Sequence, residues 1–324
     1  MMQQFLVLGS GLFGKRIAAN LAKQNKECSV TITSRSKKVA LERARQIGAS
    51  SGIAFSSARA ADLKHLLEQH GPFAAVINTT GPWNQESDYA TARTVIESGS
   101  NYIDIADSAD HHGNFHSVLD DLARQHRVVA ITGASTCPAV SMAALRHAVP
   151  NPDLVRSVRI CVSGAFNTKF GVGTVQSVLG TAGQSYERLE NRQLTKAVAW
   201  RDLEWHGFRG TSERRLLANV ITPELNLLNE ENFSNLKSAR VKAGVGHAVA
   251  PLACWIISSL PRSFVQSRFF LEGIVPRLTS LHHQMTDLIT KGNPNKEYIG
   301  EAHHPVELLL LRACERGREG SCTL

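Results

Sequence analysis

A glycine-rich segment near the N-terminus has the spacing of a loop that binds a dinucleotide. Gly9, Gly11 and Gly14 follow an apolar run and open a segment with helical periodicity. In this G-x-G-x-x-G pattern the first glycine permits a tight turn, the second lets the backbone approach a diphosphate, and the third lets helix and strand pack closely. The free N–H groups at the start of the helix then bind the diphosphate. Unless the segment is only a tight strand–helix turn, the diphosphate is held by Gly9, Ser10, Gly11, Leu12, Phe13 and Gly14.

The residues expected at the adenosine ribose carry no carboxylate. About 20 residues after the glycines, an acidic side chain would bind the 2′-hydroxyl of NAD. This sequence has Ser34, Arg35 and Ser36 there, followed by two lysines. A guanidinium with neighbouring hydroxyls suits a dianionic 2′-phosphate through charge-assisted hydrogen bonds. We therefore predict NADP(H) rather than NAD(H) as the cofactor; the alternative is the solvated basic start of a helix.

A cysteine before a proline offers a different chemistry. Cys137 lies between Thr136 and Pro138 at the start of a predicted helix, where a thiol is activated as a nucleophile. Semialdehyde and phosphorylating aldehyde dehydrogenases use such a cysteine. The base would then be His147, His206 or His247. A semialdehyde dehydrogenase with Cys137 as nucleophile is therefore the second function to consider, although an N-cap followed by proline explains the same residues.

Paired histidines raise the question of a metal site. His112 and His116 are four residues apart, and 282–283 and 303–304 are adjacent pairs. None has a carboxylate at the spacing of a His-Glu-x-x-His motif. We therefore expect solvated histidines and no metal.

The elements that must position the glycine loop alternate along the first half of the chain. Short β-branched runs precede segments with helical spacing, which is typical of repeated βα units around a parallel sheet. Several strands are apolar on both faces, as strands covered by helices on both sides must be. We expect strands at 5–8, 30–33, 53–55, 75–78, 102–105 and 128–132, and helices at 13–24, 37–47, 61–70, 87–98 and 108–125. The predicted class is α/β, with a Rossmann-type doubly wound parallel sheet in an NADP-binding domain at residues 1–150.

Polar residues follow the fourth and fifth predicted strands, where ligands bind in open α/β sheets. The loop expected to shape the nicotinamide side of the cofactor site consists of Thr79, Thr80, Gly81 and Pro82. Trp83 would cover an apolar face of the cofactor or pack in the core. Asp104 and Asp107 would bind a substrate ammonium or cap the next helix. Asp104 and Cys137 are thus the catalytic candidates, and the sequence identifies no general acid.

A different architecture begins after Pro150 and Pro152, because two prolines in three residues end any helix. Alternate residues of the next strand, 157–163, are apolar, which indicates an antiparallel sheet with one wet face. We predict an α+β domain with a largely antiparallel sheet at 151–270, for substrate binding or dimerisation. Its expected elements are a helix at 171–183 and strands at 194–200 and 239–243. Residues 271–324 form an unassigned C-terminal region, in which 308–311 has the apolar pattern of a helix core and part is expected to pack on the first domain.

Arginines are dense in this second predicted domain. The planar donor fork of arginine binds carboxylates with two hydrogen bonds, and amino-acid or keto-acid substrates carry carboxylates. The candidates are Arg201, Arg209, Arg214 and Arg215, of which we favour Arg209 or Arg214. The alternative is a solvated edge. We therefore expect a small-molecule substrate that bears a carboxylate.

Composition excludes several other classes of protein. The 324 residues are 43% hydrophobic and 20% charged, which excludes a disordered or fibrous chain. The net charge of +8 attracts anions in general, but no nucleic-acid-binding module is recognisable, so we expect no nucleic acid partner. Six cysteines form no C-x-x-C pair and the N-terminus lacks a leader-like segment, which together favour a cytoplasmic protein.

The longest apolar run, 248–257, is too short to span a bilayer. It lies in a segment, 247–260, that contains Trp255 and precedes Arg262. Such a segment suits a membrane surface, so a third function to consider is a non-catalytic NADP-binding or membrane-associated scaffold with peripheral membrane contact. The alternative is a helix buried against the first domain or a homodimer partner, because the basic face of a surface helix is missing.

Three segments make the chain similar to a known family. Residues 76–83 (VINTTGPW), 102–107 (YIDIAD) and 133–141 (GASTCPAVS) resemble the saccharopine dehydrogenase (saccharopine reductase) NADP-binding family. The resemblance covers about the first 150 residues well and continues more loosely to about residue 270. It implies a Rossmann domain with an inserted α+β domain, and NADP(H) and substrate in the cleft between them. It also implies an NADP-dependent oxidoreductase that forms or cleaves a secondary amine between an amino compound and a carbonyl, acting on CH–NH groups.

Overall fold

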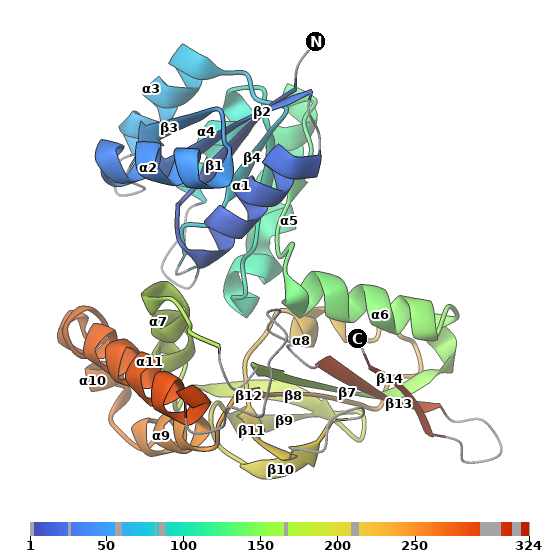
Figure 1. The fold of residues 1–324 in the computed structure, drawn as a ribbon. Helices are drawn as coiled ribbons and strands as arrows, with labels where there is room; N and C mark the ends of the chain where they lie inside the picture. Colours follow the sequence, from blue (N-terminus) through green and yellow to red (C-terminus); the bar gives the residue numbers. More distant parts are fainter. Residues whose placement is uncertain are drawn as a thin grey trace. The chain divides into compact units, whose positions relative to one another are not determined.

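The computed structural model describes residues 3–24, 27–55, 60–81, 83, 89–164, 168–208, 214–291, 306–312 and 319–323. The chain divides into two compact units, Met1–Ser135 and Thr136–Leu324 (Figure 1). This division falls before the domain boundary expected at residue 150. Helix α6 (Ser141–Ala148) accounts for the difference, because its Ala144 and Leu145 pack in the core of the second unit.

The first unit is a parallel sheet with helices between its strands (Figure 1). Its elements are β1 (Gln3–Leu8), α1 (Leu12–Gln24), β2 (Cys28–Ser34), α2 (Lys37–Ile47), β3 (Ser51–Ala54), α3 (Ala60–His70), β4 (Ala75–Asn78), α4 (Ala90–Glu97), β5 (Asn101–Asp104), α5 (Ala109–His126) and β6 (Ala130–Ile131). The strand order is β3-β2-β1-β4-β5-β6, and the neighbouring strands pair parallel. The predicted doubly wound Rossmann-type sheet is confirmed.

The side-chain alternation of β1 explains why helices cover both faces of this sheet. Leu6 and Leu8 belong to one buried cluster, which includes Leu119 of α5. Val7, between them, belongs to a second cluster with Ala18 of α1. Because successive side chains of a strand point to opposite faces, an apolar run such as Leu-Val-Leu buries both faces at once.

The second unit contains a mixed sheet and a separate hairpin. Its elements are η2 (Thr136–Val140), α6, η3 (Pro152–Leu154), β7 (Val155–Gly164), α7 (Val172–Gly180), β8 (Ser185–Glu190), β9 (Gln193–Val198), β10 (Glu204–Gly207), β11 (Arg214–Asn219), α8 (Glu224–Leu227), β12 (Ser238–Val245), α9 (Val249–Ile257), α10 (Arg262–Val265), η4 (Phe269–Ile274), α11 (Val275–Lys291), β13 (Val306–Arg312) and β14 (Glu319–Thr323). The sheet order is β10-β11-β12-β7-β13-β14, in which β7 and β12 are parallel and the other pairs antiparallel. Strands β8 and β9 form the hairpin. The predicted α+β class with a largely antiparallel sheet is therefore confirmed.

The two faces of the second sheet differ in polarity. Val158 and Ile160 of β7 are buried in the main apolar cluster of this unit. Arg159, between them, forms an ion pair with Glu204, and the buried Lys242 of β12 pairs with the same carboxylate at 3.0 Å. The face that was expected to be exposed to solvent is thus lined by ion pairs. Burial lowers the pKa of Lys242 there.

One expectation for the C-terminal region is wrong. Residues 308–311, predicted as a helix core, belong to β13, which pairs antiparallel with β7. A short apolar run suits a buried strand as well as a helix, and periodicity does not separate the two. Earlier in the same region, Val275 and Leu278 of α11 pack in the core of the second unit.

Candidate dinucleotide-binding site

The glycine loop lies at the carboxyl edge of the first sheet. Strands β1 and β4 are neighbours there, with Leu8 opposite Asn78. The strand order reverses direction between these two strands, and ligands of doubly wound sheets bind at this switch point. The loop that follows β1 and residues 79–81, which follow β4, therefore border the same crevice.

Each of the three glycines has a distinct steric environment. Gly9 has a φ of 98°, and its N–H donates to Thr33 Oγ1 at 2.9 Å. A Cβ at Gly14 would overlap the carbonyl oxygen of Gly9, so the start of α1 packs against the loop at a distance that only glycine permits. A Cβ at Gly11 would meet no atom within 4 Å. The arrangement has the tight turn, the close helix packing and the open approach that a diphosphate needs.

The start of α1 presents unused donors. Lys15 N–H bonds back to the carbonyl oxygen of Gly11 at 3.0 Å, whereas the N–H groups before it have no intrahelical acceptor. The first turn contains no acidic side chain, and Leu12 and Phe13 are exposed. A diphosphate group fits these free N–H groups and the positive end of the helix.

The basic segment after β2 is exposed. Ser36 is the N-cap of α2 but makes no side-chain capping bond, and the first turn holds Lys37 and Lys38 without an acidic residue. Arg35 is also exposed. Cations at a helix N-terminus oppose the helix dipole, so this cluster fits a bound anion better than an empty surface. A solvated start of a helix would expose the same side chains, and substitution of Arg35 separates the two interpretations.

Hydrogen bonds to the ends of β1 and β4 fix the loop that follows β4. The backbone N–H and the hydroxyl of Thr79 both donate to the carbonyl oxygen of Leu8, at 2.9 and 2.7 Å. Thr80 donates through its N–H and its hydroxyl to Asn78 Oδ1, at 3.1 and 2.6 Å. Asn78 is buried and donates to the hydroxyl of Tyr102 at 3.1 Å. The threonine hydroxyls therefore fix the loop, and Asn78 is a positioning residue that sequence reasoning missed. Gly81 is exposed, and Pro82 lies outside the described residues.

Asp104, at the end of β5, is buried and accepts hydrogen bonds from several neighbouring segments. Its Oδ1 accepts from Thr132 Oγ1 at 2.8 Å, from Gly133 N–H at 2.9 Å and from Ala106 N–H at 3.0 Å. Its Oδ2 lies 3.1 Å from Nε2 of His111. A carboxylate so occupied ties β5, the segment after β6 and α5 together, and this geometry does not favour a bond to a substrate ammonium. The next helix is capped by Ser108 rather than by Asp107, through His111 N–H at 3.3 Å.

His111 is a second buried polar group that the sequence did not indicate. It packs against Trp83 and Tyr89, with ring centroids 5.4 and 4.7 Å away. Trp83 is 6% exposed, so within the described chain it packs in the core, as its alternative interpretation held. In α5, His111 lies on the same buried face as Phe115 and Leu119. This helical spacing is the only sequence signal that separates His111 from the adjacent His112.

Cys137 belongs to the second unit. It is half-buried and forms no disulfide bond, and it lies at the first turn of η2 with extended φ and ψ of −114° and 115°. His147, one of its proposed bases, is ten positions later along η2 and α6, which corresponds to about 15 Å of helix. His247 is instead next to His282, with ring centroids 5.2 Å apart.

Three of the four candidate arginines lie in the described chain, and each has its own protein partner. Arg214 is exposed and donates to the carbonyl oxygen of Trp205 at 3.1 Å. Arg215 is buried and donates to the carbonyl oxygen of Gly246 at 2.8 Å. Arg201 lies over the ring of Trp255 and donates to a serine hydroxyl at 2.7 Å. Arg209 lies outside the described residues. Among the other three, no shared carboxylate-binding fork is formed.

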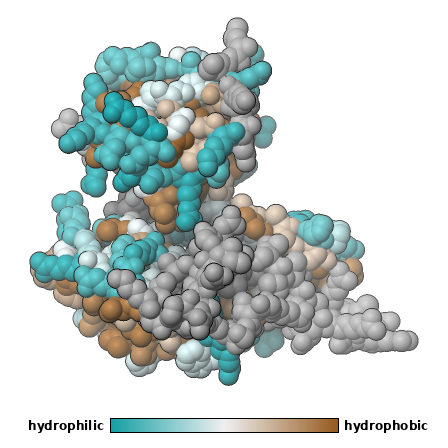
Figure 2. Space-filling view, viewed as in Figure 1, coloured by the Kyte–Doolittle hydropathy of each residue, from teal (hydrophilic) through white to brown (hydrophobic). Residues whose placement is uncertain are grey.

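The segment 247–260 is only partly covered. Pro251 and Cys254 of α9 are buried, whereas Trp255 and Ile256 are exposed, at 37% and 56%. Figure 2 shows hydrophobic residues gathered over α9 and α10. The helix is thus neither fully buried nor provided with a basic face.

The described residues contain neither a membrane-spanning helix nor a cluster of metal ligands. No helix there is both long enough and apolar enough to cross a membrane. In the same part of the chain, no three His, Cys, Asp or Glu side chains are grouped so that they could hold a metal ion.

Comparisons with known proteins concern both units. The model of the saccharopine dehydrogenase NADP binding domain matches residues 5–134. No curated protein sequence matches significantly. The apo saccharopine dehydrogenase (L-Glu forming) from Saccharomyces cerevisiae has a similar structure, with a TM-score of 0.63 at 12% identity, over 99% of this chain and 85% of that chain. This similarity shows the fold.

Two further structures are less similar. The scyllo-inositol dehydrogenase from Lactobacillus casei with bound NAD(H) has a TM-score of 0.46 at 10% identity, over 100% of this chain and 76% of that chain. The biliverdin reductase from Synechocystis sp. PCC 6803 in complex with biliverdin and NADP+ has a TM-score of 0.40 at 13% identity, over 76% of this chain and 73% of that chain.

The family match and the local geometry concern the same residues. The matched range contains the glycine loop, the basic segment after β2 and the threonines after β4. The first unit is therefore a pyridine-nucleotide-binding domain on a Rossmann-type sheet. Its sequence is similar to the saccharopine dehydrogenase NADP binding domain over residues 5–134, and the fold of the chain is similar to that of a saccharopine dehydrogenase.

Proposed function

We propose that the protein is an NADP(H)-dependent oxidoreductase that reduces an imine formed between an amino compound and a carbonyl, or catalyses the reverse oxidation. The observation that carries the proposal is the family match over residues 5–134 together with the three glycine environments of the loop after β1. The fold similarity to an L-Glu-forming saccharopine dehydrogenase supports the choice of a secondary amine as product.

The preference for NADP(H) rests on the segment after β2. Ser34, Arg35 and Ser36 present two hydroxyls and a guanidinium where a carboxylate would select NAD(H). The first turn of α2 adds two exposed lysines and no acid. These groups would hold the 2′-phosphate.

The roles of the other residues follow from their positions. When bound, the dinucleotide supplies a hydride. The loop from Gly9 to Gly14 would hold the diphosphate on the start of α1, while Thr79 and Thr80 keep the Gly81 backbone at the crevice. Protonation of the imine nitrogen already makes its carbon electrophilic, so no metal is required for this reaction.

A labelled hydride tests the reaction directly. The full-length protein is incubated with NADPH deuterated on the transferred position and with panels of amino compounds and carbonyls, and products are analysed by mass spectrometry. Deuterium on the carbon of a new secondary amine is expected only when both partners are present. Deuterated alcohol formed from the carbonyl alone would replace the proposal with a simple carbonyl reductase.

A carboxylate on the substrate and a homodimeric assembly remain predictions. Arg214 is the described one of the two favoured candidates for the carboxylate, and it donates to the backbone carbonyl oxygen of Trp205. Replacement by alanine should weaken carboxylate ligands about tenfold or more, the effect of one charged hydrogen bond, and leave NADPH binding intact. Unchanged carboxylate binding would exclude Arg214 and leave Arg209 to be tested.

A further inference from the structure

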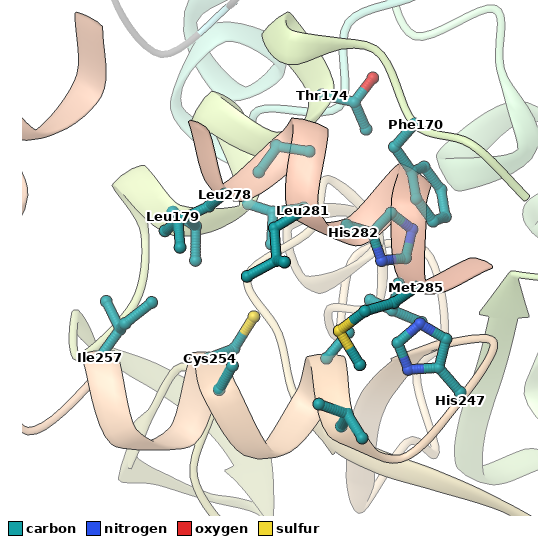
Figure 3. Close-up of a pocket in the computed structure, with 16 residues that line it drawn as sticks. Phe170, Thr174, Leu179, His247, Cys254, Ile257, Leu278, Leu281, His282 and Met285 are labelled. Atoms are coloured by element: carbon teal, nitrogen blue, oxygen red, sulfur yellow. The ribbon is translucent and has the colours of Figure 1, made fainter. Parts of the chain in front are cut away.

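The second unit contains a cavity that none of the roles above uses. It has a volume of about 190 Å³ and lies between α7, α9 and α11. Its walls are aliphatic, with Leu179 and Ile257 at one end and Leu278 and Leu281 along α11 (Figure 3). Val249 and Leu281 line the cavity and are each 51% exposed, so it opens to the surface.

Two histidines give this cavity a polar end. His247 and His282 lie with Met285 at the end opposite Ile257 (Figure 3). His282 Nε2 lies 3.2 Å from the carbonyl oxygen of Thr168, so it donates there and its Nδ1 keeps a lone pair. His247 is only 7% exposed, and neither of its ring nitrogens has a hydrogen-bond partner in the described structure.

This polar end carries no charge. Burial lowers the pKa of both His247 and His282, and the neighbouring His282 lowers that of His247 further. For His282 the effect of burial exceeds that of its hydrogen bond to Thr168, which raises the pKa. No Lys, Arg, Asp or Glu is among the described residues that line the cavity. A neutral imidazole offers one donor and one acceptor, which suits a hydroxyl or a carbonyl group and gives a carboxylate no countercharge.

We propose that this cavity binds the aliphatic chain of an uncharged amphiphile, whose hydroxyl or carbonyl group hydrogen-bonds to His247. Buried polar groups are rarely left without a partner, and His247 lacks one on both sides of its ring. An apolar cavity of about 150 Å³ holds benzene, so this one accommodates about six to eight carbon atoms. The proposal rests on the cavity alone and goes beyond the proposed reaction.

Ordered water does not explain the same features. A buried water needs two to four polar partners, and apart from the two histidines the described walls offer only the hydroxyl of Thr174 and the thiol of Cys254, which are separate from each other (Figure 3). The flexible side chain of Met285, next to both histidines, can adapt to the end of a ligand.

Three small probes test the proposal on the full-length protein. Binding of hexan-1-ol, hexane and hexanoate is measured by ligand-observed NMR near pH 8. We expect hexan-1-ol to bind most tightly and hexane about 2–10-fold more weakly, the effect of one hydrogen bond. His247→Leu should remove the difference between these two probes. No binding of any probe, equal binding of hexan-1-ol and hexane to the parent, or hexanoate as the tightest ligand would overturn the proposal.

Two variants of α9 locate the site. Ala253→Phe fills the cavity from an exposed position, and Leu252→Phe adds an aromatic ring to the adjacent exposed position, which does not line the cavity. Ala253→Phe should weaken the binding of hexan-1-ol at least tenfold, and Leu252→Phe should leave this binding unchanged. Ala250→Phe, from a deeper lining position, provides a second block, and thermal unfolding shows that each variant is folded. Binding that persists in both blocked variants would place the ligand elsewhere and overturn the proposal.

Discussion

The two units hold their candidate sites by different means. In the first unit the site consists mainly of backbone at the ends of parallel strands, with glycines where side chains would obstruct it. In the second unit the cavity consists of side chains from α7, α9 and α11, which are far apart in the sequence. One site depends on where the chain turns, and the other depends on which side chains meet.

This difference determines how each site responds to substitution. A site made of backbone tolerates no side chain where the glycines pack against neighbouring atoms or face the ligand. In a cavity made of side chains, the affinity for a ligand changes with the size of the side chain that is removed or added. The same difference determines how much of each site can be predicted from the sequence. A turn that needs glycine leaves a local signature, but a cavity between distant helices does not.

Gly14→Val is expected to have the largest effect. The new Cβ would overlap the carbonyl oxygen of Gly9, which is backbone and cannot rotate away. We expect NADPH binding to be lost and the free energy of unfolding to fall by about 3 kcal/mol or more. Isothermal titration and urea unfolding measure the two effects.

Gly11→Val is the matched control, because a Cβ there meets no protein atom within 4 Å. This variant should stay close to the parent in stability and still lose NADPH binding at least tenfold, since the side chain would occupy the approach of the diphosphate. Normal NADPH binding by Gly11→Val would contradict the placement of the diphosphate.

Asp104→Ala is expected to have the next largest effect, on stability. Its carboxylate accepts from three protein donors and lies 3.1 Å from His111 Nε2, all at a fully buried position. Because these buried donors would lose their acceptor, the free energy of unfolding should fall by about 2–3 kcal/mol, as measured by urea unfolding. If Asp104 bound a substrate ammonium instead, the variant would keep its stability and raise KM.

The fold of the first unit could be predicted because its local signals agree. The glycine loop, the strands that are apolar on both faces and the helical spacing between them all indicate the same sheet. Within the candidate site, Asn78 and His111 were missed, because a buried Asn at a strand end and one of two adjacent histidines resemble ordinary surface residues until the tertiary contacts are known.

The second unit was predicted less completely. The alternation in β7 and β12 is visible in the sequence, but β10 and β11 lie in an arginine-rich stretch that has no clear apolar period. Residues 308–311 pair with β7, a contact across more than half of the unit that local periodicity does not report. For the same reason the cavity histidines, His247 and His282, could not be brought together from the sequence.

Acid should destabilise the second unit through its cavity histidines. Burial lowers the folded-state pKa of His247 and His282 below the value of about 6.5 expected in the unfolded chain. As pH falls below about 6.5, the unfolded chain binds protons that the folded chain does not, so stability decreases. Urea unfolding between pH 8 and pH 5 should show a smaller loss in His247→Phe than in the parent. His147→Phe, at an exposed position of α6, is the control, and equal losses in all three proteins would contradict the assignment.

Cys137→Ser is expected to have the smallest effect. The proposed reaction needs no thiol nucleophile, so turnover should stay within about twofold of the parent, and iodoacetamide should not inactivate the enzyme through this position. Cys28→Ser, at another half-buried cysteine that forms no disulfide bond, is the control. A loss of more than about a hundredfold in Cys137→Ser alone would favour the semialdehyde dehydrogenase alternative.

Competitive titration of the full-length protein with NADPH and NADH tests the central claim most directly. We predict tighter binding of NADPH, and a loss of this preference of about tenfold or more in Arg35→Asp, because a charge-assisted bond to the 2′-phosphate becomes a repulsion. Arg45→Asp, which makes the same charge change in the last turn of α2, should keep the parent's preference. Tighter binding of NADH by the parent, or an unchanged preference in Arg35→Asp, would contradict the assignment of the 2′-phosphate site.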